Sequence, residues 1–352
     1  MKVVIIGGIA AGMSAAAKFK RLSPNDDVVV YEKGDIVSFG ACGLPYYVGG
    51  FFEDSNEMIA RTPEAFRQSG VEIHTKHEVT NVDFANKKLT IKKLDSNEII
   101  EESYDKLMIA SGARAIIPPI KNVNLENVVT LKSMDDGNKL RELMANEEYK
   151  KVAIIGAGFI GLEAVEAAKH RGKEVTVIQL QDRVLQEVFD KDITDLLEEE
   201  LRESGVNLLL SETVVELIGE GKVSKVKTDK REIDADIVIL ATGVKPNTDF
   251  LKSDEIKMLR NGAIVVDSYG RTSVEDVYSA GDCATINNLI TGKESYVPLA
   301  TGANKLGRIV GENLAGQNNS FQGSMSSSCI KVMDMEAART GLSEKEVLKL
   351  SL

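Results

Sequence analysis

A glycine-rich motif that occurs twice is the feature that most constrains how this chain can fold. Gly7-Gly8-Ile9-Ala10-Ala11-Gly12 follows the apolar run Lys2–Ile6, and Gly156-Ala157-Gly158-Phe159-Ile160-Gly161 follows Lys151–Ile155. A buried strand, a glycine turn and a helix begin a βαβ unit, in which free N–H groups at the helix N-terminus bind the pyrophosphate of a dinucleotide. Two copies predict two dinucleotide-binding folds in one chain.

The residues after each motif complete the pattern. We expect helices over Met13–Leu22 and Leu162–Arg171, and Gly172 is suited to end the second one. The strand that follows each helix then leads to a polar residue, Glu32 in the first copy and Gln179 in the second. An acidic residue at this position accepts hydrogen bonds from ribose hydroxyl groups.

Each half ends on a strand followed by small residues. Lys106–Ala110 leads into Ser111-Gly112, and Asp236–Leu240 leads into Ala241-Thr242-Gly243. These parallels predict an internal duplication within an α/β fold. A more polar segment with alternating apolar and polar residues interrupts each copy, at Val71–Ile100 and at Val206–Ile233. This pattern predicts an excursion of antiparallel strands in each half.

The last third of the chain departs from this repeat. A strand is expected to end in the turn Ala280-Gly281-Asp282, and a helix is expected from Pro298 to about Leu314. A further strand is expected at Ser328–Asp334 and a helix at Ser343–Lys349, where Ser343 and Glu346 form a capping box.

Composition excludes several classes of protein. The 352 residues suffice for two or three domains, and 54 acidic against 43 basic residues give a net charge of −11, which argues against nucleic-acid binding. No apolar run has membrane-spanning length, and the apolar part of Met1–Gly7 is too short for a signal sequence, so a cytoplasmic protein is expected.

The three cysteines are far apart, which predicts neither a disulfide framework nor a metal site. Cys283 and Cys329 are expected to be small buried side chains. Cys42 differs, because it lies in the glycine-rich stretch Ser38–Gly50. Gly43-Leu44-Pro45 fits the start of a helix, and a helix N-terminus lowers the pKa of a thiol and favours the reactive thiolate. Cys42 is therefore the candidate redox-active residue.

The chain resembles the flavoprotein pyridine nucleotide–disulfide oxidoreductase family in the order of its motifs. The resemblance extends over essentially the whole chain. The resemblance rests on the two glycine motifs, on Ala241-Thr242-Gly243 and on Ala280-Gly281-Asp282. Ser38-Phe39 followed by Cys42-Gly43-Leu44-Pro45-Tyr46 is similar to the coenzyme A disulfide reductase branch, which uses a single active-site cysteine. The resemblance implies two Rossmann-like domains, for FAD and NAD(P)H, and the start of a C-terminal α+β interface domain.

The resemblance also assigns roles to residues that match the family's motifs. FAD is expected to contact Gly7, Ala10, Ala11, Gly12, Glu32, Lys33, Ser38, Ala110, Ser111, Gly112, Asp282 and Ala300. NAD(P)H is expected to contact Gly156, Gly158, Phe159, Ile160, Gly161, Glu163, Gln179 and Gly243. Coenzyme A is expected to contact Ser38, Phe39, Arg21 and Arg61, with Lys18 and Lys20 as further candidates for its phosphates. Phe159 would lie against the flavin until the nicotinamide displaces it.

The choice between NADH and NADPH stays open. Gln179 tolerates a 2′-phosphate better than a glutamate would, and Arg183 is the nearby cation. No metal is expected, and His74, His77 and His170 lie away from every motif, so no histidine is assigned as a base.

The implied reaction passes electrons from NAD(P)H through FAD to Cys42, which faces the flavin. The Cys42 thiolate would attack coenzyme A disulfide, a persulfide or a polysulfide and form a mixed disulfide, most simply with coenzyme A itself. An alternative is an NADH oxidase that cycles Cys42 through a sulfenic acid, with oxygen or peroxide as acceptor. A second alternative is a truncated non-catalytic flavoprotein or redox sensor. The loop Ile9-Ala10-Ala11 lacks the histidine of the family's peroxidases, which disfavours that activity.

The expected division has four parts. Residues 1–118 form the first part of the FAD domain, 119–245 the NAD(P)H domain, 246–316 the second part of the FAD domain, and 317–352 an incomplete interface domain. A homodimer is expected if that interface is complete.

Overall fold

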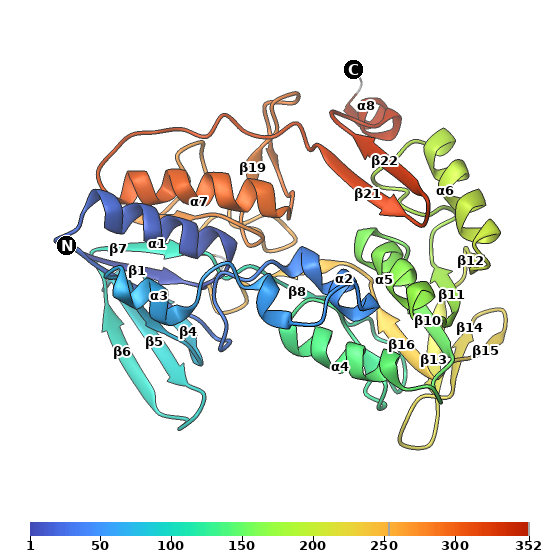
Figure 1. Ribbon diagram of the computed structural model, residues 1–352. Helices are drawn as coiled ribbons and strands as arrows, with labels where there is room; N and C mark the ends of the chain where they lie inside the picture. Colours follow the sequence, from blue (N-terminus) through green and yellow to red (C-terminus); the bar gives the residue numbers. More distant parts are fainter. Residues whose placement is uncertain (253, 351–352) are drawn as a thin grey trace. The chain divides into compact units, whose positions relative to one another are not determined.

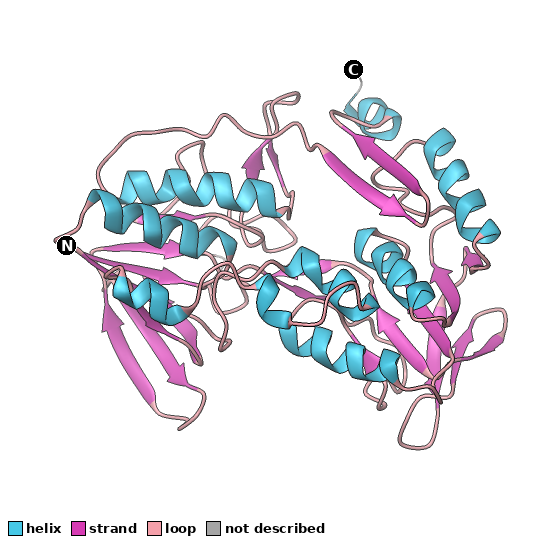
Figure 2. Ribbon diagram, viewed as in Figure 1, coloured by secondary structure: helices cyan, strands magenta, loops and turns pink. Residues whose placement is uncertain are grey.

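The computed structural model describes residues 1–252 and 254–350, and the backbone forms two compact units (Figure 1). The first unit comprises Met1–Gly40, Glu57–Arg114 and Lys245–Met325, and the second comprises Ala41–Asn56, Ala115–Val244 and Ser326–Leu352. Figure 2 shows that both units contain helices as well as strands. The fold class predicted from the sequence, an α/β protein with two parallel-sheet nucleotide folds, is confirmed.

A five-stranded parallel sheet forms the centre of the first unit. Its order is β18 (Val277–Ser279), β7 (Lys106–Ile109), β1 (Lys2–Ile6), β2 (Asp27–Tyr31) and β3 (Glu72–His74). The central strands are mostly apolar and buried, as expected for strands covered on both faces. Helices α1 (Ala10–Leu22) and α7 (Ala300–Leu314) lie side by side in Figure 1.

Shorter elements surround this sheet. The antiparallel excursion consists of β4 (His77–Asp83), β5 (Lys88–Lys93) and β6 (Ile99–Ser103). The other elements of this unit or at its borders are η2 (Ser55–Met58), α3 (Pro63–Gln68), β8 (Ala113–Ala115), β17 (Val244–Pro246), β19 (Ile286–Asn287) and β20 (Glu294–Ser295).

The second unit repeats the same architecture. Its sheet has the order β12 (Asn207–Leu210), β11 (Glu174–Gln179), β10 (Lys151–Ile155), β16 (Ile237–Leu240) and β9 (Val128–Val129). Helices α4 (Met134–Ala145), α5 (Phe159–His170) and α6 (Lys191–Glu203) accompany it, with the antiparallel strands β13 (Val214–Ile218), β14 (Lys225–Thr228) and β15 (Glu232–Asp234).

Two segments from elsewhere in the chain join the second unit. One consists of the 3₁₀ helix η1 (Ala41–Gly43) and the helix α2 (Leu44–Gly49), which packs on α4 and α5. The other is the hairpin β21 (Ser328–Val332) and β22 (Met335–Arg339), followed by α8 (Glu344–Leu350). The predicted capping box is confirmed, since Ser343 N donates to Glu346 Oε2 and Glu346 N donates to Ser343 Oγ.

Some sequence predictions need correction. Both expected excursions begin with a strand of the main parallel sheet, because β3 pairs with β2 and β12 pairs with β11. Strand β22 was not predicted. It pairs with β21, so the single strand expected at 328–334 is one arm of a hairpin. No helix among residues 1–252 and 254–350 is long and apolar enough to cross a membrane.

Candidate functional site

The two glycine turns have the same backbone construction in their respective units. Gly7 has φ +100°, and a Cβ there would lie 2.2 Å from Ala110 O. Gly156 has φ +106°, and a Cβ there would lie 2.4 Å from Ala241 O. Each turn therefore needs glycine both for its dihedral angle and for its close contact with the neighbouring strand's end.

The later glycines have two different roles. A Cβ on Gly12 or Gly161 would lie 1.9 or 2.1 Å from the carbonyl oxygen of the first glycine of its own turn, so both positions serve close packing. Gly158 instead is exposed, with no heavy atom of the described residues within 4 Å of its would-be Cβ. This open backbone at the start of α5 fits the approach of a dinucleotide pyrophosphate. In the first copy Ile9 is the N-cap, as Gly158 is in the second.

The polar residues at the end of the second strand of each fold also correspond, since Glu32 directly follows β2 and Gln179 is the last residue of β11. Glu32 accepts hydrogen bonds from Gly8 N at 2.6 Å and from Gly34 N at 2.7 Å. Burial raises the pKa of the Glu32 carboxyl group, although these N–H donors oppose that shift. Gln179 Oε1 likewise accepts from Ala157 N at 3.2 Å. Both side chains thus brace the glycine turn from the position where a ribose is expected.

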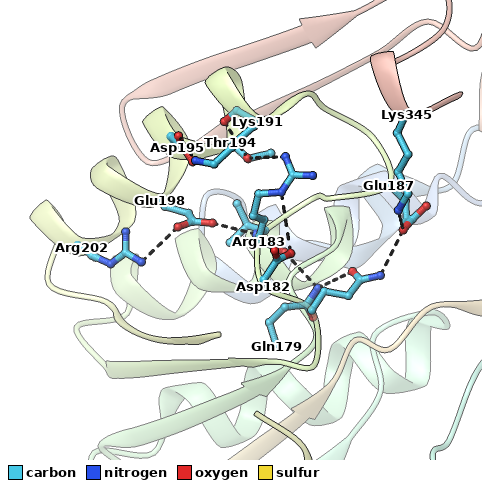
Figure 3. A network of polar contacts seen from close by, with 12 residues as sticks. Gln179, Asp182, Arg183, Glu187, Lys191, Thr194, Asp195, Glu198, Arg202 and Lys345 are labelled. Atoms are coloured by element: carbon cyan, nitrogen blue, oxygen red, sulfur yellow. Dashed lines mark hydrogen bonds and ion pairs between the residues drawn. The ribbon is translucent and has the colours of Figure 1, made fainter. Parts of the chain in front are cut away.

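A polar network extends from Gln179 through the segment between β11 and α6 (Figure 3). Gln179 Nε2 donates to Gln181 Oε1 at 2.9 Å, and Gln181 Nε2 lies 3.4 Å from Glu187 Oε1. The Arg183 guanidinium instead lies 3.5 Å from Thr194 Oγ1. A role for Arg183 in binding a 2′-phosphate stays a prediction.

Other predicted cofactor residues of the first unit lie at strand ends and loop turns. Ser111 Oγ donates to Asn247 O, and Gly112 follows with φ +65°. Asp282 is half-buried and its carbonyl accepts from Tyr296 OH, while Ala300 is the exposed first residue of α7. Lys33, which is also predicted to contact FAD, is exposed and forms an ion pair with Glu78. Their contacts with FAD stay predictions.

The predicted coenzyme A residues have mixed surroundings. Ser38 has φ +54°, uncommon for a residue other than glycine, and its N–H donates to Gly8 O. Phe39 is half-buried and bridges to Ile59. Arg61 lies over the Phe66 ring and donates to Ala65 O, whereas Arg21 is exposed in the last turn of α1. These roles also stay predictions.

The remaining candidate cations of α1 have structural partners. Lys18 Nζ lies 2.8 Å from Glu312 Oε1, and Lys20 Nζ donates to Asp26 O at 2.8 Å. Both lysines therefore link the helix to its surroundings in the first unit.

Cys42 is exposed in η1, directly before α2, and Gly43 is the N-cap of that helix. The predicted helix start with Pro45 in its first turn is confirmed. The last three carbonyl groups of α2 receive side-chain contacts: Arg141 binds Tyr47 O, Arg171 binds Val48 O at 3.1 Å, and His170 Nδ1 lies 2.8 Å from Gly49 O. Cations at a helix C-terminus stabilise it, so the segment carrying Cys42 precedes an anchored helix.

Glu163 of α5 lies near residues of α2 and β21. Burial, and secondarily the charge of Glu166, raise its pKa to about 7. Burial and the same two glutamates raise the pKa of Tyr46 in α2. Lys331 Nζ of β21 pairs with Glu166 Oε1 at 2.5 Å.

The other predicted NAD(P)H residues lie at the ends of elements in the second unit. Phe159 and Ile160 are half-buried in the first turn of α5, and Gly243 is exposed after β16. Their contacts with the coenzyme stay predictions.

Two predictions about cysteines and histidines need correction. Cys283 is buried as predicted, but Cys329 is exposed, because it alternates with the inward-facing Ile330 of the hairpin. His74 and His77 are adjacent to the first nucleotide motif rather than remote from it. Glu32 N donates to His74 O, and His77 N donates to Glu32 O.

His170 was also predicted to be remote, yet it contacts the end of the Ser38–Gly50 stretch at Gly49 and stacks on Phe51 with 4.2 Å between ring centroids. Tyr31 stacks in the same way on His74, at 5.1 Å. No local pattern could have revealed these histidine contacts, since each depends on the pairing of segments distant in sequence. No group of His, Cys, Asp and Glu suited to hold a metal occurs among the described residues.

Comparisons with known proteins agree with this geometry. A family model described as pyridine nucleotide-disulphide oxidoreductase matches residues 1–307. The NAD(P)H coenzyme A polysulfide/persulfide reductase of Pyrococcus horikoshii is 42% identical over 349 residues, which cover 99% of this chain and 77% of the relative.

Two solved structures share the fold throughout the chain. The water-forming NADH oxidase of Lactobacillus brevis, bound to NADH, has a TM-score of 0.96 and 35% identity, and the match covers 100% of this chain and 78% of that chain. An engineered water-forming NADPH oxidase bound to NADPH gives the same TM-score, identity and coverage. Backbone similarity therefore does not distinguish the two coenzymes.

Proposed function

Because this chain belongs to the pyridine nucleotide-disulphide oxidoreductase family and is an NAD(P)H- and FAD-dependent oxidoreductase, we propose that it reduces coenzyme A disulfide, or a related persulfide or polysulfide, through Cys42. The observation that carries the proposal is the exposed Cys42 in η1, before the anchored helix α2. The Pyrococcus relative, whose name specifies a coenzyme A polysulfide/persulfide reductase, supports this choice of acceptor.

The chain's residues divide the work of this reaction. Glu32 and the first glycine turn would hold FAD, and Gln179 and the second turn would hold the reduced pyridine nucleotide. The bound cofactors supply hydride and two-electron transfer. Gly158 leaves the approach to the second turn open for a pyrophosphate.

Cys42 would act as the nucleophile. Its thiolate attacks one sulfur of coenzyme A disulfide, the sulfur–sulfur bond breaks, and one coenzyme A leaves as a thiolate that takes a proton. The mixed disulfide on Cys42 then takes two electrons and one proton, which releases the second coenzyme A thiol and restores the Cys42 thiolate. The sum consumes one NAD(P)H and one proton for two thiols.

A second candidate is an NADH oxidase, which the similarity to the Lactobacillus enzyme supports. In that reaction Cys42 would be oxidised to a sulfenic acid and reduced again at the expense of NADH, with oxygen or peroxide as the oxidant. The same residue serves both candidates, so the acceptor must be decided by measurement.

The test compares Cys42→Ser with Cys329→Ser, which alters the other exposed cysteine of the described residues. Flavin-loaded protein is mixed anaerobically with NADH or NADPH and then with coenzyme A disulfide, polysulfide, oxygen or peroxide. We expect Cys42→Ser to retain flavin reduction but to lose disulfide reduction by at least about a thousandfold, as for removal of a covalent nucleophile. Cys329→Ser should match the unaltered protein.

Two outcomes would count against the proposal. If Cys42→Ser still reduces the disulfide, Cys42 is not the nucleophile. Rapid reoxidation by oxygen or peroxide, with no response to either sulfur acceptor, favours the oxidase.

A further inference from the structure

The segment between β11 and α6 is bonded directly to the second glycine turn. We call this segment, residues 180–190, the β11–α6 loop. Leu185 N donates to Ala157 O at 2.9 Å, while Ala157 N donates to Gln179 Oε1 at 3.2 Å. Both backbone polar groups of Ala157 are therefore held, one from the end of β11 and one from the loop. A shift of this loop would move the turn that is expected to receive the coenzyme's pyrophosphate.

The β11–α6 loop contains a strained residue. Leu185 is almost fully buried and has φ +46°, a left-handed conformation that is unfavourable for leucine. Val184 is also buried, and its N–H donates to Glu198 Oε1 of α6. A backbone conformation of this kind persists only where surrounding contacts determine it.

Contacts from the C-terminal segment help to hold the β11–α6 loop in this conformation. The Arg339 guanidinium donates to Val188 O, Glu344 N donates to Asp190 Oδ1 at 2.9 Å, and Lys345 Nζ donates to Glu187 Oε1 at 2.5 Å. All three acceptors belong to residues 187–190, so the end of β22 and the start of α8 hold one end of the loop.

Arg339 is the most enclosed member of these contacts. Its side chain is 13% exposed and also donates to Gly341 O and to Glu346, the partner of Ser343 in the capping box of α8. The Lys345–Glu187 pair is more open, with side chains 38% and 56% exposed. Exposed ion pairs contribute little to global stability, so the effect expected of Lys345 is local.

A series of side-chain contacts leads from α8 toward the glycine turn, and Figure 3 shows its members Lys345, Glu187 and Gln179. Glu187 Oε1 accepts from Lys345 and lies 3.4 Å from Gln181 Nε2. Gln181 Oε1 accepts from Gln179, and Gln179 Oε1 accepts from Ala157 N. The C-terminal segment is thus connected to Ala157 both through these side chains and through the backbone of the loop.

We propose that Arg339 and Lys345 are positioning residues for the reduced pyridine nucleotide: they hold the β11–α6 loop, and through it the second glycine turn, in the conformation that binds the coenzyme. This inference rests on the proposed function only in assigning the second glycine turn to NAD(P)H. Coenzyme affinity depends on the two residues, whereas electron transfer after binding does not.

The experiment measures flavin reduction in the FAD-loaded protein by anaerobic stopped flow, over a range of NADH or NADPH concentrations. Arg339→Met and Lys345→Met are compared with Lys349→Met, which removes the same charge from an exposed position of α8. Arg339→Met should raise the half-saturating coenzyme concentration about tenfold, the ratio for one lost charge-assisted hydrogen bond. Lys345→Met should raise it about threefold, as for an exposed pair. The limiting rate should stay within about twofold, and Lys349→Met should change neither quantity.

Two rescue variants separate positioning from general damage. Arg339→Lys should recover part of the affinity, and the charge exchange Glu187→Lys with Lys345→Glu should recover what either single change loses. Unchanged half-saturation in Arg339→Met and Lys345→Met, or a fall in the limiting rate alone, would overturn the proposal. If Arg339→Met does not fold, the double variant Glu187→Lys with Lys345→Glu tests the proposal. Recovery of the coenzyme affinity in the double variant supports positioning. A loss of affinity equal to the sum of the two single losses contradicts it. The readout uses no sulfur acceptor, so it is independent of the acceptor proposed above.

Discussion

Glu163 of α5 has an environment in which its charge is unfavourable. Burial, reinforced by Glu166 of the same helix, raises its pKa from 4.5 to about 7. The pKa of Tyr46 in α2 is raised first by burial and then by the charges of Glu163 and Glu166. Lys331 pairs with Glu166, and within the described part of the chain no cation forms an ion pair with Glu163.

This shift has a definite sign for stability. Between pH 4.5 and about 7 the folded state binds more protons than the unfolded chain, so ionisation of Glu163 at higher pH destabilises the fold. Glu163→Gln should therefore gain stability relative to the unaltered protein as pH rises from about 5 to about 8, by on the order of 2 kcal/mol after allowance for solvent screening. Urea unfolding at both pH values measures the gain. A difference between the two proteins that does not change with pH would show that Glu163 ionises normally.

Individual side chains were predictable from the sequence where a local motif determines them. Glu32 directly follows β2 and Gln179 is the last residue of β11, and both brace the adjacent glycine turn. Cys329 and His74 were assigned wrongly, because their surroundings depend on strand pairing that local sequence does not reveal.

At the level of elements, two glycines allow α1 and α7 to approach closely. A Cβ on Gly307 would lie 2.5 Å from Ala11 O, and one on Gly311 would lie 2.5 Å from Ala15 O. The obstructing atoms belong to the backbone of α1, so a side chain there forces the helices apart. Since α1 begins at the first glycine turn, its position also bears on the expected FAD site.

Gly307→Ala should consequently destabilise the protein by about 1–3 kcal/mol, as overpacking does, and should lower the retention of FAD. Gly302→Ala in the same helix is the control, because its new Cβ would meet only the flexible end of Ile286 at 3.3 Å. The control should change stability by less than about 1 kcal/mol, since alanine also improves helix propensity. Urea unfolding of the apoproteins compares the two. Equal stabilities would rule out the packing described here.

The helices and strands of both nucleotide folds could be predicted because their apolar runs and glycine turns are local signals. Strand β22 could not, since Met335–Arg339 lacks an apolar run and becomes a strand by pairing with β21. The packing of α2 on α4 and α5 was equally hidden, as it depends on residues 94 to 123 positions away.

For the whole molecule, chain order and compact units do not coincide. Residues Ala41–Asn56, which include Cys42, belong to the second unit although segments of the first unit flank them in sequence. The duplicated motifs predicted two nucleotide folds. No sequence signal indicated that Ala41–Asn56 would belong to the second unit. The four-part functional division stays a prediction, since compactness does not identify the ligand of each part.

Cys42 is proposed to form a mixed disulfide with the sulfur acceptor, which electrons from NAD(P)H then resolve. The most direct measurement treats the flavin-loaded protein with coenzyme A disulfide, maps adducts by peptide mass spectrometry, and then adds NAD(P)H without oxygen. We expect a coenzyme A adduct on Cys42 that disappears upon reduction. Once unbound coenzyme A disulfide has been removed, one coenzyme A thiol should be released from the adduct for each NAD(P)H consumed. A Cys42 that carries no adduct, or an adduct that NAD(P)H does not release while flavin is reduced, would refute this mechanism.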